Sequence, residues 1–182
     1  MTPTSTRDRI LTATAELFRR QGYSGTGLKA VVGQAEAPFG SLYHHFPGGK
    51  QQLAEEVIHA GGASFQALVC AVYDAQPTPA EAVSAVFSGA AEVLAATDFE
   101  DACPIATVAL EVAGTDEVLR RATAEVFARW TEALTERVGD RDVAHAVLAA
   151  LEGAFVLCRA QRSVEPMLAA GRMAAAFVAA GR

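Results

Sequence analysis

Helical spacing is the feature that most restricts the fold of this chain, because apolar residues recur three and four positions apart through nearly all of its 182 residues. Alanine, the best helix former, makes up about a fifth of the sequence, whereas the apolar–polar alternation of a strand is hard to find. Proline and glycine stand between the helical stretches and separate them. The sequence therefore predicts an all-α fold of about nine helices.

Local signals set the ends of the first predicted helices. Ser5 can cap the first helix, and Gly22 is expected to end it in a left-handed conformation. Two short helices follow, from Leu28 to about Ala35 and from Phe39 to His45, and Pro38 suits the first turn of the second. Further helices are expected from about residue 50 into the seventies and over about 80–96, 103–113, 117–138, 141–159 and 165–179.

The composition of the chain is that of a globular protein and argues against a membrane or disulfide-rich one. Hydrophobic residues make up 51% and charged ones 20%, as in a globular chain. Charged residues interrupt every apolar run before the ~20 residues of a membrane span, and residues 1–10 hold no export-type apolar segment. The three cysteines lie far apart and cannot all pair, which argues against a disulfide framework. We therefore expect a cytoplasmic protein without a membrane partner.

Charge is divided unevenly along the chain. The net charge is -6, yet residues 1–50 carry six basic groups against three acidic ones, and residues 51–182 carry nine against eighteen. A small basic head and a larger acidic body are the arrangement expected of a chain whose head binds an anion.

A short helix, a tight turn and a second short helix, supported by a longer first helix, form the layout of a helix-turn-helix unit. This layout coincides with the basic segment. We therefore predict a DNA-binding domain over residues 1–48, followed by a helical body over residues 49–182. Residues 39–45 are the predicted recognition helix, and double-stranded DNA is the predicted partner.

Two stretches at this place resemble the TetR-type transcriptional regulators. They are GYSGTGLKAVV at 22–32 and GSLYHHF at 40–46, and the segment PFGSLYHHFPGGK at 38–50 resembles the LmrA/YxaF-like subgroup, as does the later Cys103-Pro104 pair. The resemblance implies a homodimer that binds a palindromic operator, most simply as a repressor. It also implies release of the operator by a small molecule, with no cofactor.

The DNA-contacting residues follow from the chemistry of phosphates and bases. The Tyr43 phenol and the Lys50 ammonium can bind phosphates, and Thr26 can cap the second helix as well as bind a phosphate. Lys29 and Ser41 are expected near base edges. The full set of predicted DNA-binding residues is Thr26, Gly27, Lys29, Pro38, Phe39, Gly40, Ser41, Tyr43, His44, His45 and Lys50. For Tyr43 the alternative is a core aromatic, and for His44 and Lys29 a solvated side chain.

Three positions depart from the family pattern. Glu36 stands where the turn usually has glycine, so a left-handed conformation there costs about 1 kcal/mol. Gly27 replaces a frequent hydroxyl residue, and Phe39 replaces a frequent lysine. We therefore expect modest phosphate affinity per subunit, raised by dimerisation.

The last two predicted helices carry more apolar residues than one core-facing stripe needs, which indicates a second copy of the chain as partner. The predicted interface residues are Val147, Leu151, Ala154, Phe155, Cys158, Met167, Met173 and Phe177. The alternative is a final helix that packs inside its own monomer.

In the resembled family the C-terminal helices form an effector cavity and a dimer interface. The resemblance therefore implies an effector-binding and dimerisation domain over residues 49–182, with the inner faces of its middle helices lining the cavity. The predicted lining residues are Phe65, Phe87, Cys103, Leu110, Trp130 and Phe155, with ordinary core positions as the alternative. Few charges lie at inward positions, so the effector is expected to be apolar or aromatic. Glu111 could anchor a polar group of the effector, or face water.

Other classes have weaker support. Cys103 near a helix start could be a redox-sensing thiol, or the nucleophile of a small cysteine-dependent enzyme with His59 or His145 as its base. The sequence has no nucleotide-binding glycine loop after a strand and no metal-ligand spacing. We therefore expect no catalytic residue, no metal site and no enzymatic activity.

Overall fold

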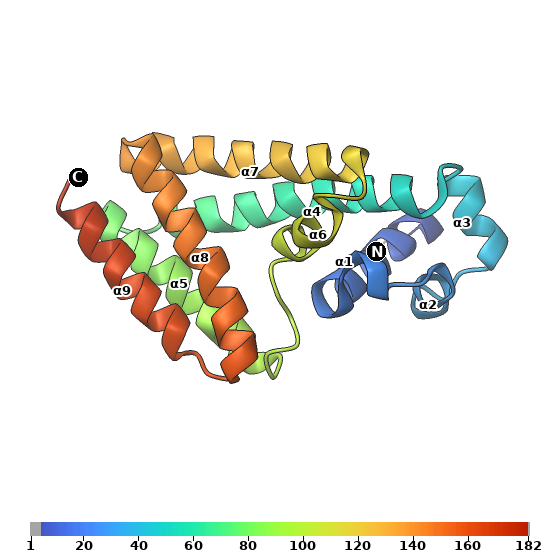
Figure 1. Cartoon of the computed structure of the whole chain (residues 1–182), viewed down its shortest axis with the longest axis horizontal. Helices are drawn as coiled ribbons and strands as arrows, with labels where there is room; N and C mark the ends of the chain where they lie inside the picture. Colours follow the sequence, from blue (N-terminus) through green and yellow to red (C-terminus); the bar gives the residue numbers. More distant parts are fainter. Residues whose placement is uncertain (1–4, 182) are drawn as a thin grey trace. The chain divides into compact units, whose positions relative to one another are not determined.

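A computed structural model describes residues 5–181, and all regular structure within that range is helical (Figure 1). The helices are α1 (Thr6–Gly25), α2 (Leu28–Gln34), α3 (Phe39–His45), α4 (Gly49–Asp74), α5 (Pro79–Ala96), α6 (Pro104–Val112), α7 (Glu117–Val138), α8 (Arg141–Gln161) and α9 (Glu165–Ala179). The predicted all-α class with nine helices is confirmed for the described residues.

Helix ends lie within two residues of the predicted ones except at α1, which continues to Gly25. Gly22 has the expected positive φ, 74°, and interrupts α1 with a kink rather than ending it. The Ser5 hydroxyl accepts the Asp8 N–H at 3.1 Å and caps α1 as predicted. Pro38 was predicted in the first turn of α3. Its backbone is extended, so it is the N-cap that precedes the first turn.

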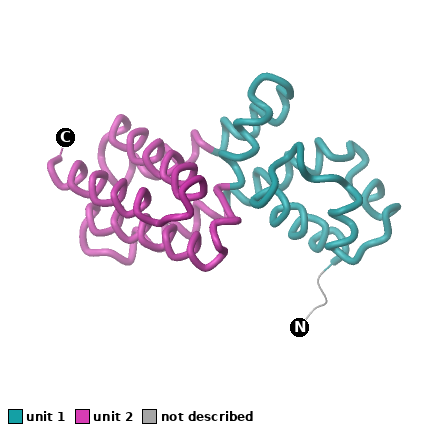
Figure 2. The backbone as a smooth tube through the Cα atoms, turned by 60° about the horizontal axis from the view of Figure 1, so that its bottom comes forward, with its two compact units in different colours: residues 1–63, 104–126 teal, residues 64–103, 127–182 magenta. Residues whose placement is uncertain are grey.

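The chain forms two compact units, coloured separately in Figure 2. Unit 1 comprises the residues up to Ala63 together with Pro104–Val126, and unit 2 comprises Ser64–Cys103 and the residues from Phe127 onwards. Unit 1 thus contains α6 and parts of α4 and α7 in addition to the helix-turn-helix segment. The functional boundary after residue 48 stays a prediction.

The turn between α2 and α3 is held by α1. Glu36 adopts the left-handed conformation expected from its place in the turn, with φ 49°. Arg9 donates from Nε to the Ala35 carbonyl at 2.9 Å and from Nη2 to the Glu36 carbonyl at 3.2 Å. Since a left-handed non-glycine residue costs about 1 kcal/mol, these bonds help to stabilise the turn that sets the angle of α3.

Within unit 1, α6 packs on α1 at the kink. The Glu111 carboxylate occupies the space beside the bare Cα of Gly22, where an added Cβ would lie 1.8 Å from Oε1. Its Oε2 accepts the Ser24 N–H at 2.6 Å. Glu111 therefore fastens α6 to the corner at which α1 leads into α2.

Unit 2 is built on α5, α8 and α9, which lie side by side (Figure 1). Gly171 lets α9 approach α5 closely, because a Cβ at this position would lie 2.7 Å from the Phe87 Cβ of α5.

By length and composition α8 could cross a membrane, contrary to the expectation that no segment of the chain could. Its residues Val143, Val147 and Leu151 are buried in unit 2, so we treat α8 as a core helix.

Replacing Glu111 by alanine should destabilise the protein by about 1–2 kcal/mol, because the Ser24 N–H loses a charged acceptor. The control is Leu110→Ala at the adjacent position, whose side chain is 78% exposed and whose loss should change stability by less than about 0.5 kcal/mol. Urea unfolding followed by circular dichroism measures both. Equal unfolding midpoints for the two variants would contradict the anchoring contact.

Candidate functional site

One face of α3 is exposed because buried residues on its opposite side anchor the helix in unit 1. Leu42 and Phe46 are fully buried in unit 1, so the opposite side of the helix faces solvent. Phe39 and Tyr43 stand there 44% and 49% exposed, one helical turn apart, with ring centroids separated by 5.8 Å in an edge-on contact. Exposure excludes the alternative that Tyr43 is a core aromatic. An α-helix with such a free face can enter a major groove.

Most of the predicted DNA-binding residues share this exposure. Those whose side chain or backbone is exposed are Gly27, Lys29, Pro38, Phe39, Gly40, Tyr43 and His44, whereas Ser41, His45 and Lys50 are half-buried. They lie on α2, α3, the segment just before each of them, and the start of α4. The helix-turn-helix therefore brings ten of the eleven predicted residues to accessible positions.

Thr26 is the exception, and its prediction needs correction. The side chain is 1% exposed, and its hydroxyl donates to the Gly22 carbonyl at 2.7 Å. The N-cap of α2 is Gly27, without a side-chain cap. Thr26 therefore stabilises the kinked end of α1 and has no exposed surface for a phosphate.

Lys50 lies close to the start of α4 and against α1. Its Nζ is 4.3 Å from the centre of the Tyr23 ring, in a cation–π contact. Burial lowers the pKa of Lys50 from its ordinary value, and the nearby Glu111 carboxylate opposes this effect. Tyr23 thus positions the ammonium near the surface of the helix-turn-helix.

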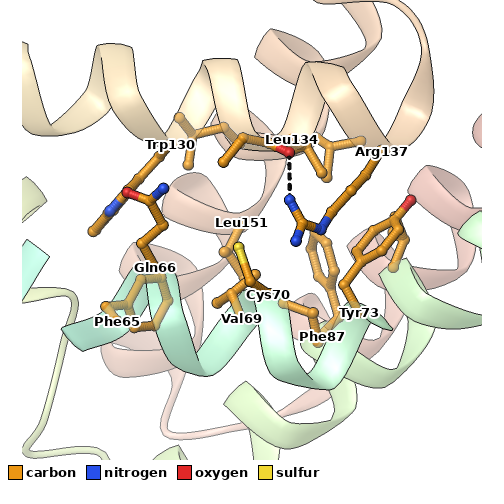
Figure 3. A pocket seen from close by; sticks show the side chains of 15 residues that line it. Phe65, Gln66, Val69, Cys70, Tyr73, Phe87, Trp130, Leu134, Arg137 and Leu151 are labelled. Carbon is orange, nitrogen blue, oxygen red and sulfur yellow. Dashed lines mark hydrogen bonds between the residues drawn. The ribbon is translucent and has the colours of Figure 1, made fainter. Parts of the chain in front are cut away.

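Unit 2 contains an apolar cavity that is partly open to solvent and holds about 60 Å³ of space for the centre of a water-sized sphere (Figure 3). Four helices line it with residues at helical spacing. The lining residues are Phe65, Gln66, Val69, Cys70 and Tyr73 of α4, Val83, Val86 and Phe87 of α5, Trp130, Ala133, Leu134 and Arg137 of α7, and Val147, Leu148 and Leu151 of α8. This apolar and aromatic lining is typical of a site for a small organic ligand.

Half of the predicted lining residues lie at this cavity. Phe65, Phe87 and Trp130 line it, and the Phe65 and Trp130 ring centroids are 4.8 Å apart. Leu110 was predicted wrongly, because it belongs to unit 1 and is 78% exposed. Cys103 and Phe155 are buried in unit 2 but do not line the cavity.

The polar lining residues were missed by the sequence analysis. Gln66, Cys70 and Tyr73 follow one another three and four positions apart on α4, and Arg137 lies two turns after Trp130 on α7. The sequence feature that could have indicated them is a polar or charged residue on an otherwise apolar helical face. Figure 3 shows Gln66 near Trp130, and Tyr73 with Arg137 at the opposite end.

The predicted dimer residues divide into two groups. Six of them are at most 9% exposed within the monomer and cannot reach a partner, namely Val147, Leu151, Ala154, Phe155, Cys158 and Met167. Met173 and Phe177 on α9 are 72% and 46% exposed. The α8 residues of the predicted set face the inside of unit 2, whereas the exposed apolar residues Val156 and Leu157 lie on another face of the same helix.

Comparison with known proteins identifies the family. Residues 10–57 match the family of bacterial regulatory proteins called tetR, and residues 79–173 match the LmrA/YxaF-like transcriptional regulator C-terminal domain. The HTH-type transcriptional regulator LmrA of Bacillus subtilis (strain 168) is 31% identical over 170 residues, which are 89% of this chain and 90% of that protein. The chain belongs to the TetR family.

Solved TetR structures share the fold of this TetR-family chain. The regulatory protein TetR from Rhodobacter sphaeroides is similar with a TM-score of 0.84 and 20% identity, over 94% of this chain and 98% of that one. A cysteine mutant of CifR complexed with a 26-base-pair operator is similar with a TM-score of 0.80 and 23% identity, over 93% and 95%. These structures show the TetR fold for the described residues, and membership of the family makes the chain a DNA-binding transcriptional regulator.

Cys103 of this TetR-family chain is buried beside a carboxylate. Both Glu152 carboxylate oxygens are inaccessible to solvent, and neither has a hydrogen-bond partner of good geometry among the described residues. Burial raises the pKa of Glu152 to about 7, although the neighbouring Cys103 thiol favours the charged form. An adjacent carboxylate opposes formation of a Cys103 thiolate.

The raised pKa of Glu152 makes stability depend on pH. The folded state holds this proton more tightly than the unfolded state, so the contribution is full below about pH 4.5 and is lost as the pH rises through about 7. Between these limits the free energy of unfolding should fall by up to about 3 kcal/mol relative to Glu152→Gln. Urea unfolding of the wild-type protein and of Glu152→Gln between these pH values measures this change. A difference in the free energy of unfolding that stays constant with pH would contradict the prediction.

Proposed function

We propose that this chain is a homodimeric transcriptional repressor that binds a palindromic operator through α3. In this proposal a small apolar or aromatic effector occupies the cavity of unit 2 and releases the operator. The observation that carries the proposal is the exposed face of α3, with Phe39 and Tyr43 presented on a helix that is anchored by the buried Leu42.

The charge and geometry of the helix-turn-helix support contact with DNA. Residues 1–50 carry an excess of three positive charges in a chain that is negative overall. Lys29 and Tyr43 are exposed, and Lys50 lies near them in sequence at the start of α4. In the proposed complex, Tyr43 and Lys50 bind phosphates, while Gly40 and Ser41 bring the start of α3 close to the bases.

The double variant Tyr43→Ala, Lys50→Ala should lose operator binding. Each phosphate contact contributes about 1 kcal/mol, and a dimer loses four, which corresponds to a loss of more than about 100-fold in affinity. Gel-shift titration with the DNA upstream of the chain's own gene measures this loss. Affinity should also fall steeply with salt, because phosphate contacts release counterions.

The matched control removes an exposed positive charge from unit 2. Arg141→Ala at the start of α8 should leave operator affinity within about twofold, because it removes no phosphate contact. Size-exclusion chromatography checks that both variants elute as the wild-type protein does. Wild-type affinity in the double variant would show that α3 and Lys50 do not carry the interface.

Free apolar faces on α8 and α9 support dimerisation. The exposed residues recur at helical spacing and are small or apolar, namely Ala146, Ala149, Gly153, Val156, Leu157 and Ala160 on α8, and Ala169, Met173, Ala176 and Phe177 on α9. Small residues let two helices approach closely, and the larger ones supply apolar area to bury. A second copy that presents the same faces would cover them.

Phe177→Asp should convert the dimer into a monomer of 19.0 kDa, because it places a charge in an apolar interface. Leu68→Asp is the control, since Leu68 is 61% exposed on α4 and lies outside these faces. Light scattering after size exclusion measures both masses. A Phe177→Asp protein that keeps twice the chain mass would refute this interface.

A transmission route from effector to DNA is supported by the position of α6. Glu111 holds α6 against Gly22 and Ser24 at the end of α1. The segment that follows Cys103 in sequence is therefore attached to the helix-turn-helix. We propose that effector binding shifts α6 and with it the angle of α3.

The alternatives have less support. A redox sensor needs an accessible, acidic thiol, whereas Cys103 is 4% exposed and lies beside Glu152. The relatives named above are transcriptional regulators, and we propose that this chain likewise has no catalytic activity. We place it in the cytoplasm, where it can reach its operator.

A further inference from the structure

We propose that Phe39 selects thymine in each operator half-site, by packing its ring on the 5-methyl group of that base in the major groove. This inference rests on the proposed binding of an operator by α3, and it names one base that the operator must contain.

Phe39 presents an apolar surface to solvent on the free face of α3. Its side chain is 44% exposed, whereas Leu42 and Phe46, which anchor the helix, are fully buried. A ring in water gains free energy when another apolar group covers it. A single exposed ring is common on protein surfaces, so its position decides what can cover it.

Phe39 lies where a helix-turn-helix contacts bases. The residues that begin a recognition helix contact base edges in the major groove, and Phe39 is the first residue of α3. Gly40 follows it. Among the described residues, a Cβ added at Gly40 would have no atom within 4 Å beyond its chain neighbours and the helix backbone. The backbone beside Phe39 can therefore approach the bases closely, with the ring between helix and groove.

Tyr43 holds the Phe39 ring in a defined orientation. The two ring centroids are 5.8 Å apart, and the ring planes meet at 61°. Pro38, with φ -61°, restricts the backbone just before the ring. Phenylalanine has few side-chain torsions, so little further freedom is lost when a base covers the ring. The ring is thus preorganised to meet one group in the groove.

The chemistry of the ring selects thymine. A phenyl ring has no hydrogen-bond donor or acceptor of its own, whereas the other bases present polar atoms to the major groove. Thymine alone carries a methyl group there. Packing against that methyl removes apolar area of both partners from water. Packing against the polar edge of another base, or against a phosphate, would remove water without replacing its hydrogen bonds.

The test removes the methyl group without changing any base pair, because deoxyuracil pairs as thymine does and lacks only the 5-methyl group. An operator duplex is first selected from a random pool of double-stranded DNA by the full-length protein. Each thymine of one half-site, together with its symmetric mate, is then replaced by deoxyuracil, one position at a time. Fluorescence anisotropy at a fixed salt concentration measures the affinity for each duplex.

For the wild-type protein we expect one thymine position at which replacement weakens binding by about fourfold per half-site and about fifteenfold for both, the effect of one buried methyl group in each. Phe39→Ala should bind the thymine duplex as weakly as the wild type binds the uracil duplex, and should bind the two duplexes within about twofold of each other. Tyr43→Phe is the matched control. It loses a phosphate contact, so both duplexes bind more weakly, but it keeps the ring that supports Phe39 and therefore keeps the wild-type ratio.

Three results would overturn the inference besides the absence of any thymine whose methyl group changes wild-type affinity. A ratio that survives in Phe39→Ala shows that another side chain contacts the methyl group. A ratio lost in Tyr43→Phe shows that the Tyr43 hydroxyl makes the contact. A Phe39→Ala protein that binds both duplexes far more weakly than the wild type binds the uracil duplex shows that the ring shapes α3 rather than selects a base.

The same titrations separate this inference from the proposed function. Wild-type protein that binds its operator without dependence on any methyl group refutes the selection of thymine alone. One copy of the chain bound to a single half-site, with the methyl dependence present, refutes the dimeric repressor and leaves the inference standing. A pool from which no sequence is enriched refutes both.

Discussion

The contact between Gly22 and Glu111 is the constraint on which unit 1 depends. Gly22 kinks α1 with a positive φ and has no Cβ, and the Glu111 carboxylate fills the space that a side chain would need. The same carboxylate binds the Ser24 N–H, 87 positions away in sequence. One glycine thus lets a helix from the middle of the chain join the compact unit that presents α3.

Sequence predicted the helix-turn-helix well because its signals are local. The Ser5 cap, the positive φ of Gly22 and the left-handed Glu36 each depend on a few neighbouring residues, and the structure has all three, although Gly22 kinks α1 instead of ending it. The TetR motif added the assignment of α3. The prediction for Thr26 was wrong because its hydroxyl can either cap the second helix and bind a phosphate or donate to a backbone carbonyl. In the structure it donates to the buried Gly22 carbonyl. Only the folded kink determines that choice.

The cavity and the dimer faces could be predicted only in part, because α8 is apolar on more than one side. Periodicity identified Val147, Leu151 and Phe155 as one face, but no local signal states whether that face meets α5 and α9 or a second chain. Packing of α5, α8 and α9 buries it, which leaves Val156 and Leu157 outward. Tyr73 and Arg137 were missed because a polar residue within an apolar face has no distinctive spacing.

The central claim is that two copies of this chain read DNA through α3. Selection of bound sequences from a random pool of double-stranded DNA by the full-length protein tests it most directly. The account predicts enrichment of one inverted repeat with two matching half-sites, as two-fold symmetric heads require. No enriched sequence, or a single half-site without two-fold symmetry, would contradict it.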